Sequence, residues 1–162
     1  MPNDALYVIF IFAAMSVSSP RTADDFAAYY QLRYTVLRAP WQQPPGSERA
    51  PDDDDPTTLH ALLRYPTPNG PVVAVGRVHP SAPGQAQVRF MAVDPAYQGR
   101  GLGRQVLAFL EAGARQQSLT ECILHARATA VPFYEAAGYA VVAPSHTLFG
   151  NVPHFLMRKA LH

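Results

Sequence analysis

The chain contains 162 residues, of which 48% are hydrophobic and 15% are charged, and its formal net charge is +1. This length and composition predict one globular domain over residues 1–162, with enough residues to bury a sizeable core. A net charge so close to zero provides no basic field for a phosphate backbone, so nucleic acid is not an expected partner.

The cysteine and histidine content argues against disulfides and structural metal. Cys122 is the only cysteine, so an internal disulfide cannot form and a reducing, cytoplasmic compartment is expected. The six histidines have neither the spacing of one helix face nor a cysteine pair nearby. We therefore expect no metal site.

The first apolar segment, ALYVIFIFAAM, covers residues 5–15. Its eleven residues fall short of the roughly 20 that a membrane-spanning helix needs, so no membrane partner is expected. No Lys or Arg precedes the segment and Asp4 is acidic, which is the wrong flank for a secretory signal. We expect residues 5–19 to stay in the mature protein as a first strand or a short extension.

A helix and a long loop follow. Thr22 resembles a helix N-cap with acidic residues in the first turn, and apolar residues at helical spacing predict an amphipathic helix over residues 22–38. Residues 39–56 are rich in proline and acidic residues and predict a surface loop with at most one helical turn. Within this loop we expect residues 52–55 to be a solvated acidic run; attraction of a cationic amine is the alternative.

The rest of the chain alternates between strand and helix signals. The pair Asn69-Gly70 predicts a hairpin turn. Hydrophobic spacing and turn residues predict an antiparallel meander of strands 58–65, 71–79 and 86–93, a helix over about 102–117, strand 121–127, a short helix at 132–137, and strands 139–143 and 154–160.

The segment Gln98–Arg104 carries three glycines at alternate positions between strand 86–93 and the next helix. The N–H groups of a helix's first turn have no intrahelical partners, so with the helix dipole they form an anion site. Glycine lets the backbone approach a ligand closely, and Arg100 and Arg104 add positive charge. A diphosphate is the predicted ligand, and a ligand-free turn is the alternative.

Neither common nucleotide motif is present, because a Walker loop needs Gly-Lys-Ser/Thr and a dinucleotide fingerprint needs glycine in place of Arg104. Residues 98–103, QGRGLG, match the phosphate motif Gln/Arg-x-x-Gly-x-Gly/Ala of the GNAT-type N-acetyltransferase superfamily. Residues 130–139, AVPFYEAAGY, are similar to that family's second motif, in which Ala is followed by Tyr-Glu and then Gly-Phe/Tyr. The chain resembles this superfamily strongly over residues 86–160 and weakly before them.

The resemblance implies an α/β fold of GNAT type: a mixed, mostly antiparallel sheet with splayed central strands, flanked by helices. Strands 86–93 and 121–127 would splay apart and hold the pantetheine arm of acetyl-CoA, a cosubstrate, with no metal. Members often carry Asn where this chain has Arg127, and the pattern resembles a subgroup of small, largely uncharacterised acetyltransferases. The residues expected to bind the cofactor are Met91, Ala92, Val93, Gln98, Gly99, Arg100, Gly101, Leu102, Gly103, Arg104 and Arg127.

Four residues are candidates for chemistry or acceptor binding. The second motif puts Tyr134 where the family has a general acid that protonates the departing thiolate; packing under the short helix is its alternative role. His125, on the same strand face as Arg127, is a candidate base or relay, and a structural histidine fits the pattern equally well. Trp41 and His154 are candidate acceptor-site residues; the alternatives are a loop anchor and a residue at a strand start.

We expect an acetyl-CoA-dependent N-acetyltransferase that acetylates a primary amine by direct attack in a ternary complex. Tyr134 favours this enzyme over a catalytically silent acyl-CoA-binding sensor, and the missing nucleotide motifs disfavour a nucleotide-binding module. The acceptor is expected to be a small-molecule or protein amine, and a homodimer is compatible with the sequence.

Overall fold

The computed structural model describes residues 17–162, so the apolar segment at residues 5–15 lies outside the described residues. Ser18 forms an isolated antiparallel bridge with Leu62. The Ser18 N–H donates to the Leu62 carbonyl at 3.0 Å, and the Leu62 N–H donates to the Ser18 carbonyl at 2.8 Å. The described chain therefore begins beside the strand that contains Leu62.

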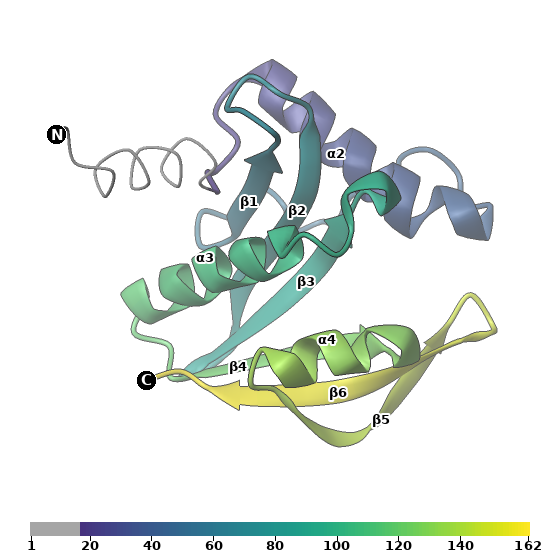
Figure 1. Cartoon of the computed structure of the whole chain (residues 1–162). Coiled ribbons are helices and arrows are strands. Elements are labelled where there is room, and N and C mark those ends of the chain that lie inside the picture. The colour runs from purple at the N-terminus through teal and green to yellow at the C-terminus, as the bar shows by residue number, and fades with distance from the viewer. Residues whose placement is uncertain (1–16) are drawn as a thin grey trace, which may run out of the picture.

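Six strands form one sheet in the order β1-β2-β3-β4-β6-β5 (Figure 1). All neighbouring strands are antiparallel except β3 and β4, which are parallel. The bounds are β1 (Leu59–Arg64), β2 (Val72–Ala82), β3 (Gln85–Val93), β4 (Glu121–Arg127), β5 (Ala140–Leu148) and β6 (Val152–Ala160). The predicted mixed, mostly antiparallel sheet is confirmed.

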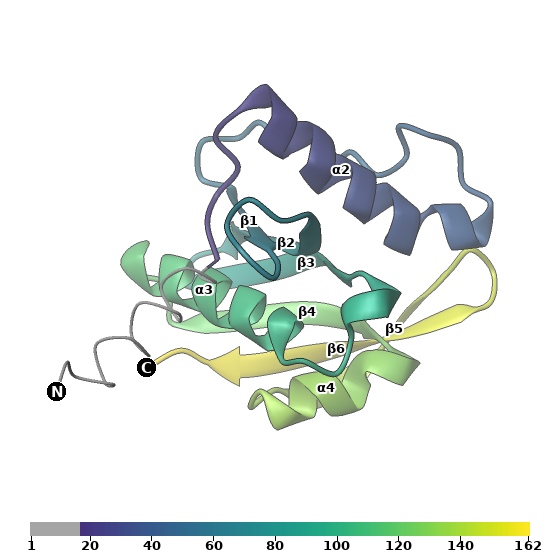
Figure 2. The ribbon, with the colours of Figure 1, turned by 45° about the horizontal axis from the view of Figure 1, so that its top comes forward.

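Helices cover both faces of this sheet. They are α2 (Ala23–Leu37), α3 (Leu102–Gln116) and α4 (Val131–Ala136), with short 3-10 helices η1 (Ala39–Trp41), η2 (Pro95–Tyr97) and η3 (Ala128–Ala130). Helix α2 lies on one face of the sheet over β2 and β3. Helices α3 and α4 lie on the other face, α3 over β1–β3 and α4 over the half that contains β4, β6 and β5 (Figures 1 and 2). Because β2 is covered on both sides, its first seven residues are all buried, and its sequence is a continuous apolar run broken by Gly76 and Arg77.

The parallel ladder between β3 and β4 is short. It consists of the pairs Gln85–Glu121, Ala86–Cys122 and Gln87–Ile123. Both strands continue beyond these pairs, β3 to Val93 and β4 to Arg127. The two strands therefore splay apart, as predicted, and leave a gap in the middle of the sheet (Figure 1).

A bulge in β3 accompanies the splay. Val75 of β2 pairs with Ala92 and Arg77 pairs with Arg89, so three steps along β3 oppose two steps along β2. Within the bulge Phe90 has a positive φ of 56°, a conformation that a bulky residue rarely adopts. Such strain persists where the surrounding structure enforces it and is common at functional sites.

The C-terminal hairpin is longer than predicted. Strand β5 extends to Leu148 and β6 begins at Val152, whereas the predicted strands leave residues 144–153 as a loop. Most of β5 is exposed, so its sequence lacks the apolar alternation by which a half-buried strand is recognised.

The acidic run was predicted to be solvated, and this is wrong for Asp53. Asp53 is buried and accepts hydrogen bonds from Arg33 at 3.0 Å and Arg77 at 2.6 Å. Arg77 also pairs with Asp52 at 2.7 Å. Burial opposes ionisation of Asp53, but the Ala50 N–H and the two guanidinium groups outweigh it and lower the pKa of this carboxyl. These ion pairs fasten the long loop to α2 and β2.

We predict that Asp53→Asn destabilises the fold by about 3 kcal/mol or more, because removing one partner of a buried ion pair leaves uncompensated charge. The pKa of Asp53 is lowered in the folded state. The contribution of its ionised carboxylate to the free energy of unfolding is therefore complete above about pH 4 and is lost as the pH falls further. Urea unfolding measures the loss. Asp54→Asn, at an exposed neighbouring position, is the matched control; equal stability of the two variants would contradict the assignment.

Candidate active site

The glycine loop leads from β3 into the N-terminus of α3. Gly99 and Gly101 have φ angles of 77° and 76°, and a side chain would meet open space at both, so backbone conformation is what requires glycine there. The Gln105 N–H donates to the Gly101 carbonyl at 3.2 Å. The N–H groups of Leu102 to Arg104 precede this bond and lie at the positive end of the helix dipole, where an anion would bind.

Gly103 differs from the other two glycines. A Cβ at this position would lie 3.0 Å from the Val93 side chain and 3.4 Å from that of Phe133. The missing side chain therefore lets α3 pack closely between β3 and α4.

A cleft of about 670 Å³ runs beside this loop and along the splayed ends of β3 and β4. Every residue predicted to bind the cofactor lines it except Arg100. The Arg100 guanidinium donates to the Tyr65 hydroxyl at 3.2 Å and lies 5.5 Å from the ring centroids of Tyr65 and Tyr97. Of the two arginines in the glycine loop, only Arg104 therefore places its charge at this cleft.

The edge of β3 that faces the gap provides backbone groups to this cleft. The Asp94 N–H donates to the Val73 carbonyl of β2 at 2.8 Å. Backbone groups alternate in direction along a strand, so the N–H groups of Val93 and Met91 point to the opposite side, where β4 has separated. An extended ligand could pair there in place of a neighbouring strand.

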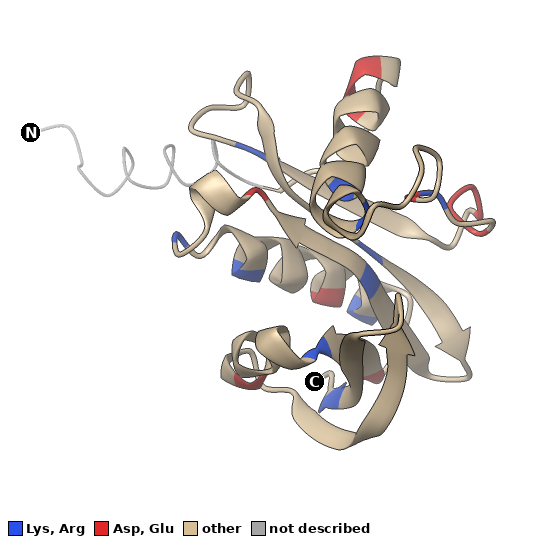
Figure 3. Cartoon of the chain, turned by 90° about the vertical axis from the view of Figure 1, so that its right-hand side faces the viewer, with Lys and Arg blue, Asp and Glu red and all other residues tan. Residues whose placement is uncertain are grey.

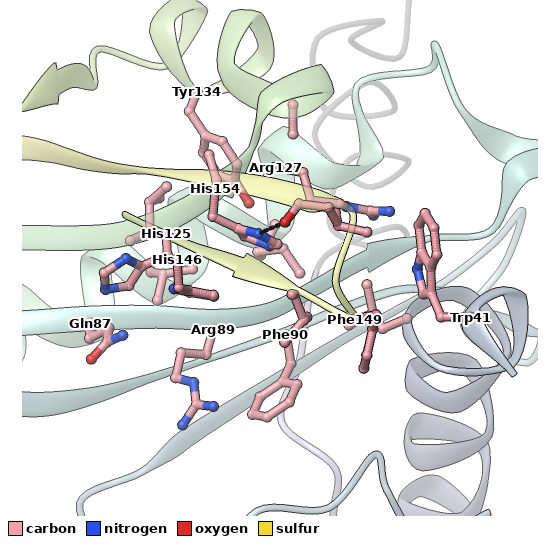
Figure 4. Close-up of a pocket in the computed structure, with 18 of the residues that line it drawn as sticks. Trp41, Gln87, Arg89, Phe90, His125, Arg127, Tyr134, His146, Phe149 and His154 are labelled. Atoms are coloured by element: carbon pink, nitrogen blue, oxygen red, sulfur yellow. Dashed lines mark hydrogen bonds between the residues drawn. The ribbon is translucent and has the colours of Figure 1, made fainter. Parts of the chain in front are cut away.

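A second cleft, of about 410 Å³, lies between the end of α2, the strands β3 and β4, and the β5–β6 hairpin (Figure 4). Three of the predicted residues, Trp41, His125 and His154, line this cleft alone. Met91, Arg127, Ala130 and Tyr134 line both clefts. The two clefts therefore meet where β3 and β4 separate.

Tyr134 lies at this junction. Its ring is buried and packs edge to face with Phe133 and Tyr139, at centroid distances of 4.9 and 5.9 Å. Its hydroxyl makes no hydrogen bond to any residue in the described part of the chain. Burial raises the pKa of Tyr134 well above its ordinary value, and Arg127 only partly opposes this, so the hydroxyl stays protonated at neutral pH.

Three histidines lie together in the second cleft. The rings of His146 and His154 stack at 4.6 Å, and His125 lies 5.3 Å from His146. Ser145 Oγ is 2.6 Å from Nδ1 of His125 and 3.0 Å from Nδ1 of His146. Because a hydroxyl has one proton, it donates to at most one of these nitrogens.

His154 has a defined tautomer when neutral. Its Nδ1 lies 2.9 Å from the Val152 carbonyl, which can only accept, so Nδ1 carries the proton and Nε2 carries the lone pair. Burial lowers the pKa of His154, and positive charge on His146 and Arg127 lowers it further against the opposing effect of the Val152 carbonyl. Burial also lowers the pKa of His125.

Aromatic stacking closes one end of the second cleft. The Trp41 and Phe149 rings lie 6.1 Å apart at an interplanar angle of 27°, and the Arg38 guanidinium is 5.6 Å from the Phe149 centroid. Trp41 thus lines the cleft and also ties the loop after α2 to the β5–β6 turn.

Sequence reasoning missed several lining residues. Arg38 lies at the end of the predicted helix, and Arg89 and Phe90 lie in a predicted strand whose bulge no local signal marks. His146 and Phe149 belong to the hairpin extension that was predicted as loop. The Pro144–Gly150 segment, with its histidine and aromatic residue, is the one signal that could have indicated a functional hairpin.

Two findings concern membranes and metal ions. None of the helices in residues 17–162 combines the length and apolar character needed to span a bilayer. Over the same residues, no group of three or more His, Cys, Asp or Glu side chains is arranged to hold a metal ion.

Known proteins resemble this chain in sequence and in fold. Residues 65–161 match the family described as "Acetyltransferase (GNAT) domain". The uncharacterized N-acetyltransferase YjcF of Bacillus subtilis (strain 168) is 30% identical over 76 residues, which cover 47% of this chain and 54% of that protein. The match thus spans about half the length of this curated relative.

Two solved structures share the fold. A protein from Lactobacillus plantarum, provisionally named N-acetyltransferase, has a TM-score of 0.78 at 29% identity, with 92% of this chain and 99% of that chain covered. An aminoglycoside 6'-N-acetyltransferase complexed with coenzyme A has a TM-score of 0.77 at 13% identity, with 91% and 98% covered. The fold, the glycine loop and the family match over more than half of the sequence lead to one conclusion: this chain belongs to the GNAT acetyltransferase family.

Proposed function

We propose that this protein transfers the acetyl group of acetyl-CoA to a primary amine that enters through the second cleft. The observation that carries the proposal is the meeting of the two clefts at Met91 and Tyr134, because a thioester in one can contact an amine in the other there. Membership of the GNAT acetyltransferase family supports acetyl-CoA as the donor.

The cleft beside the glycine loop fits the donor. The first turn of α3 and Arg104 would bind the diphosphate, and the free edge of β3 would hold the pantetheine arm between β3 and β4. The bound acetyl-CoA supplies an activated thioester. A backbone N–H of Met91 or Val93 would then stabilise the oxyanion that forms when the amine attacks.

A base must take a proton from the amine, and no Asp or Glu among residues 17–162 lines the second cleft. We assign this role to His154. Its neutral tautomer presents the Nε2 lone pair, and its lowered pKa keeps it neutral at pH 7. His125 is the alternative base or relay, but the Ser145 hydroxyl shared with His146 does not fix its tautomer.

Tyr134 would complete the transfer as the general acid. The amine nitrogen attacks the thioester carbonyl carbon, the carbon–sulfur bond breaks, and the electron pair stays on sulfur. The Tyr134 hydroxyl, protonated and without another partner in the described chain, can give its proton to that thiolate. Proton return from His154 through solvent would restore both groups. A silent acyl-CoA sensor would bind the donor and release no thiol.

Binding of the diphosphate is tested by two arginines of the same loop. We predict that Arg104→Gln weakens acetyl-CoA binding about tenfold, because a hydrogen bond between charged groups is lost. Arg100→Gln is the matched control and should retain affinity, since Arg100 contacts Tyr65 instead of the cleft. Titration calorimetry on both variants makes the measurement. Loss of affinity in Arg100→Gln alone would contradict the assigned site.

The acid is tested by Tyr134→Phe, which keeps the ring and removes the hydroxyl. We predict that kcat falls about 10²-fold while the acetyl-CoA affinity and the melting temperature stay unchanged. Thiol release and thermal unfolding are the two measurements. An unchanged kcat together with lower stability would mean that Tyr134 is a packing residue.

The base is tested by pH. Since the pKa of His154 is lowered, its neutral form persists below the ordinary histidine pKa of about 6.5, and kcat at saturating amine should fall only below that pH. His154→Gln should lose this acidic limb and about 10²-fold in kcat. His125→Gln should keep the limb. The reverse result would make His125 the base, and an acidic limb in both variants would exclude both histidines.

A further inference from the structure

The cleft that we assign to the acceptor carries charge of one sign. Among residues 17–162, its lining includes Arg38, Arg89 and Arg127 and contains no Asp or Glu. Arg127 also lines the cleft beside the glycine loop, whereas Arg38 and Arg89 line the acceptor cleft alone. Two arginines are therefore available to an acceptor without competing for the donor.

The acidic side chains near these arginines already have partners. Asp53 pairs with Arg33 and Arg77, and Asp52 pairs with Arg77. The Glu48 carboxylate accepts the Gly46 N–H at 2.7 Å and does not line the cleft. No ion pair involves Arg38 or Arg89 within the described part of the chain.

Four arginines lie around the ring of Phe90. The guanidinium carbons of Arg33, Arg89, Arg77 and Arg38 lie 4.1, 4.7, 5.3 and 5.7 Å from its centroid. Figure 3 shows basic positions gathered where α2 approaches the sheet, with acidic positions on the loop that follows the helix. Two carboxylates of that loop, Asp52 and Asp53, form ion pairs with Arg33 and Arg77, whereas Arg38 and Arg89 form none within the described part of the chain.

Local contacts hold Arg38 in place without neutralising it. Its Nε donates to the Ser47 carbonyl and its Nη1 to the Leu37 carbonyl, each at 3.0 Å. Burial and the charges of Arg33 and Arg89 lower the pKa of Arg38, while Glu48 opposes this. Burial and Arg77 likewise lower the pKa of Arg89 against the opposing charge of Asp52. A negative charge in the cleft would stabilise both guanidinium groups.

We infer that the acceptor is an amine that also carries an acidic group, a carboxylate or a phosphate, which Arg38 and Arg89 bind. This inference rests on the proposed function and names its substrate class. Guanidinium groups match the geometry of both anions and can bind them with two parallel hydrogen bonds. The same charges repel amines with several positive charges, so polyamines are poor acceptors.

The test uses the full chain saturated with CoA, so that the diphosphate site is filled. Calorimetry compares β-alanine with its carboxamide and with the matching diamine, and phosphoethanolamine with ethanolamine. We expect at least one acidic amine to bind about tenfold or more tightly than its uncharged counterpart, because charge-assisted hydrogen bonds are gained. The two acids distinguish a carboxylate from a phosphate.

Variants identify the residues responsible. In Arg89→Gln the preference for the acidic amine should disappear, while the affinity for the uncharged amine and for CoA stays the same. Arg38→Gln should have the same effect. The matched control, Arg21→Gln, makes the same charge change at an exposed residue that lines neither cleft and should keep the preference.

Three results would overturn the inference: no preference for either acidic amine, tighter binding of the diamine, or a preference that survives both Arg38→Gln and Arg89→Gln. Failure of the proposed function is a separate result. In that case the chain would not bind acetyl-CoA, or would release no thiol with any acidic, uncharged or cationic amine.

Discussion

Strands β3 and β4 share three residue pairs before they separate, and both proposed binding clefts open from that separation. Parallel pairing along their whole length would satisfy the backbone of β3 and close the sheet. Instead β3 stays paired with β2 on one side and exposes its other edge near Met91 and Val93. The glycine loop continues from the end of this strand, so the N-terminus of α3 and the free edge belong to one cleft.

Buried ion pairs between the long loop and its neighbours are a second feature on which the structure depends. Asp53 lies between Arg33 and Arg77 and holds the long loop against α2 and β2. This pairing engages Asp52 and Asp53 with Arg33 and Arg77. The stability of the loop and the charge of the second cleft are therefore linked, because the acids that fasten the loop do not form ion pairs with the arginines that line that cleft.

Sequence reasoning placed an element correctly where its signal is contained in one continuous segment. The glycine loop leads into the start of α3 and Tyr134 lies in the short helix α4, as local rules predict, whereas the roles of these residues in binding and catalysis stay predictions. It failed where the partner is distant: Asp53 pairs with arginines 20 and 24 residues away, so a run of acids gave no sign of burial. The direction of the Arg100 side chain, set by Tyr65 from 35 residues earlier, was equally hidden. The exposed hairpin with His146 lacks any apolar pattern.

The bulge in β3 determines which residues of that strand face each side of the sheet. Before the bulge, Ala86 and Val88 pack in the core beneath α3, and after it Met91 and Val93 pack against that same core while Ala92 faces α2. The strand has thus shifted from even to odd positions, a change of phase that one extra residue accomplishes. Deletion of one residue at the bulge would therefore leave a regular strand with the same residues on each face, whereas deletion of one residue elsewhere in β3, with the bulge retained, would turn part of the strand to the wrong face of the sheet.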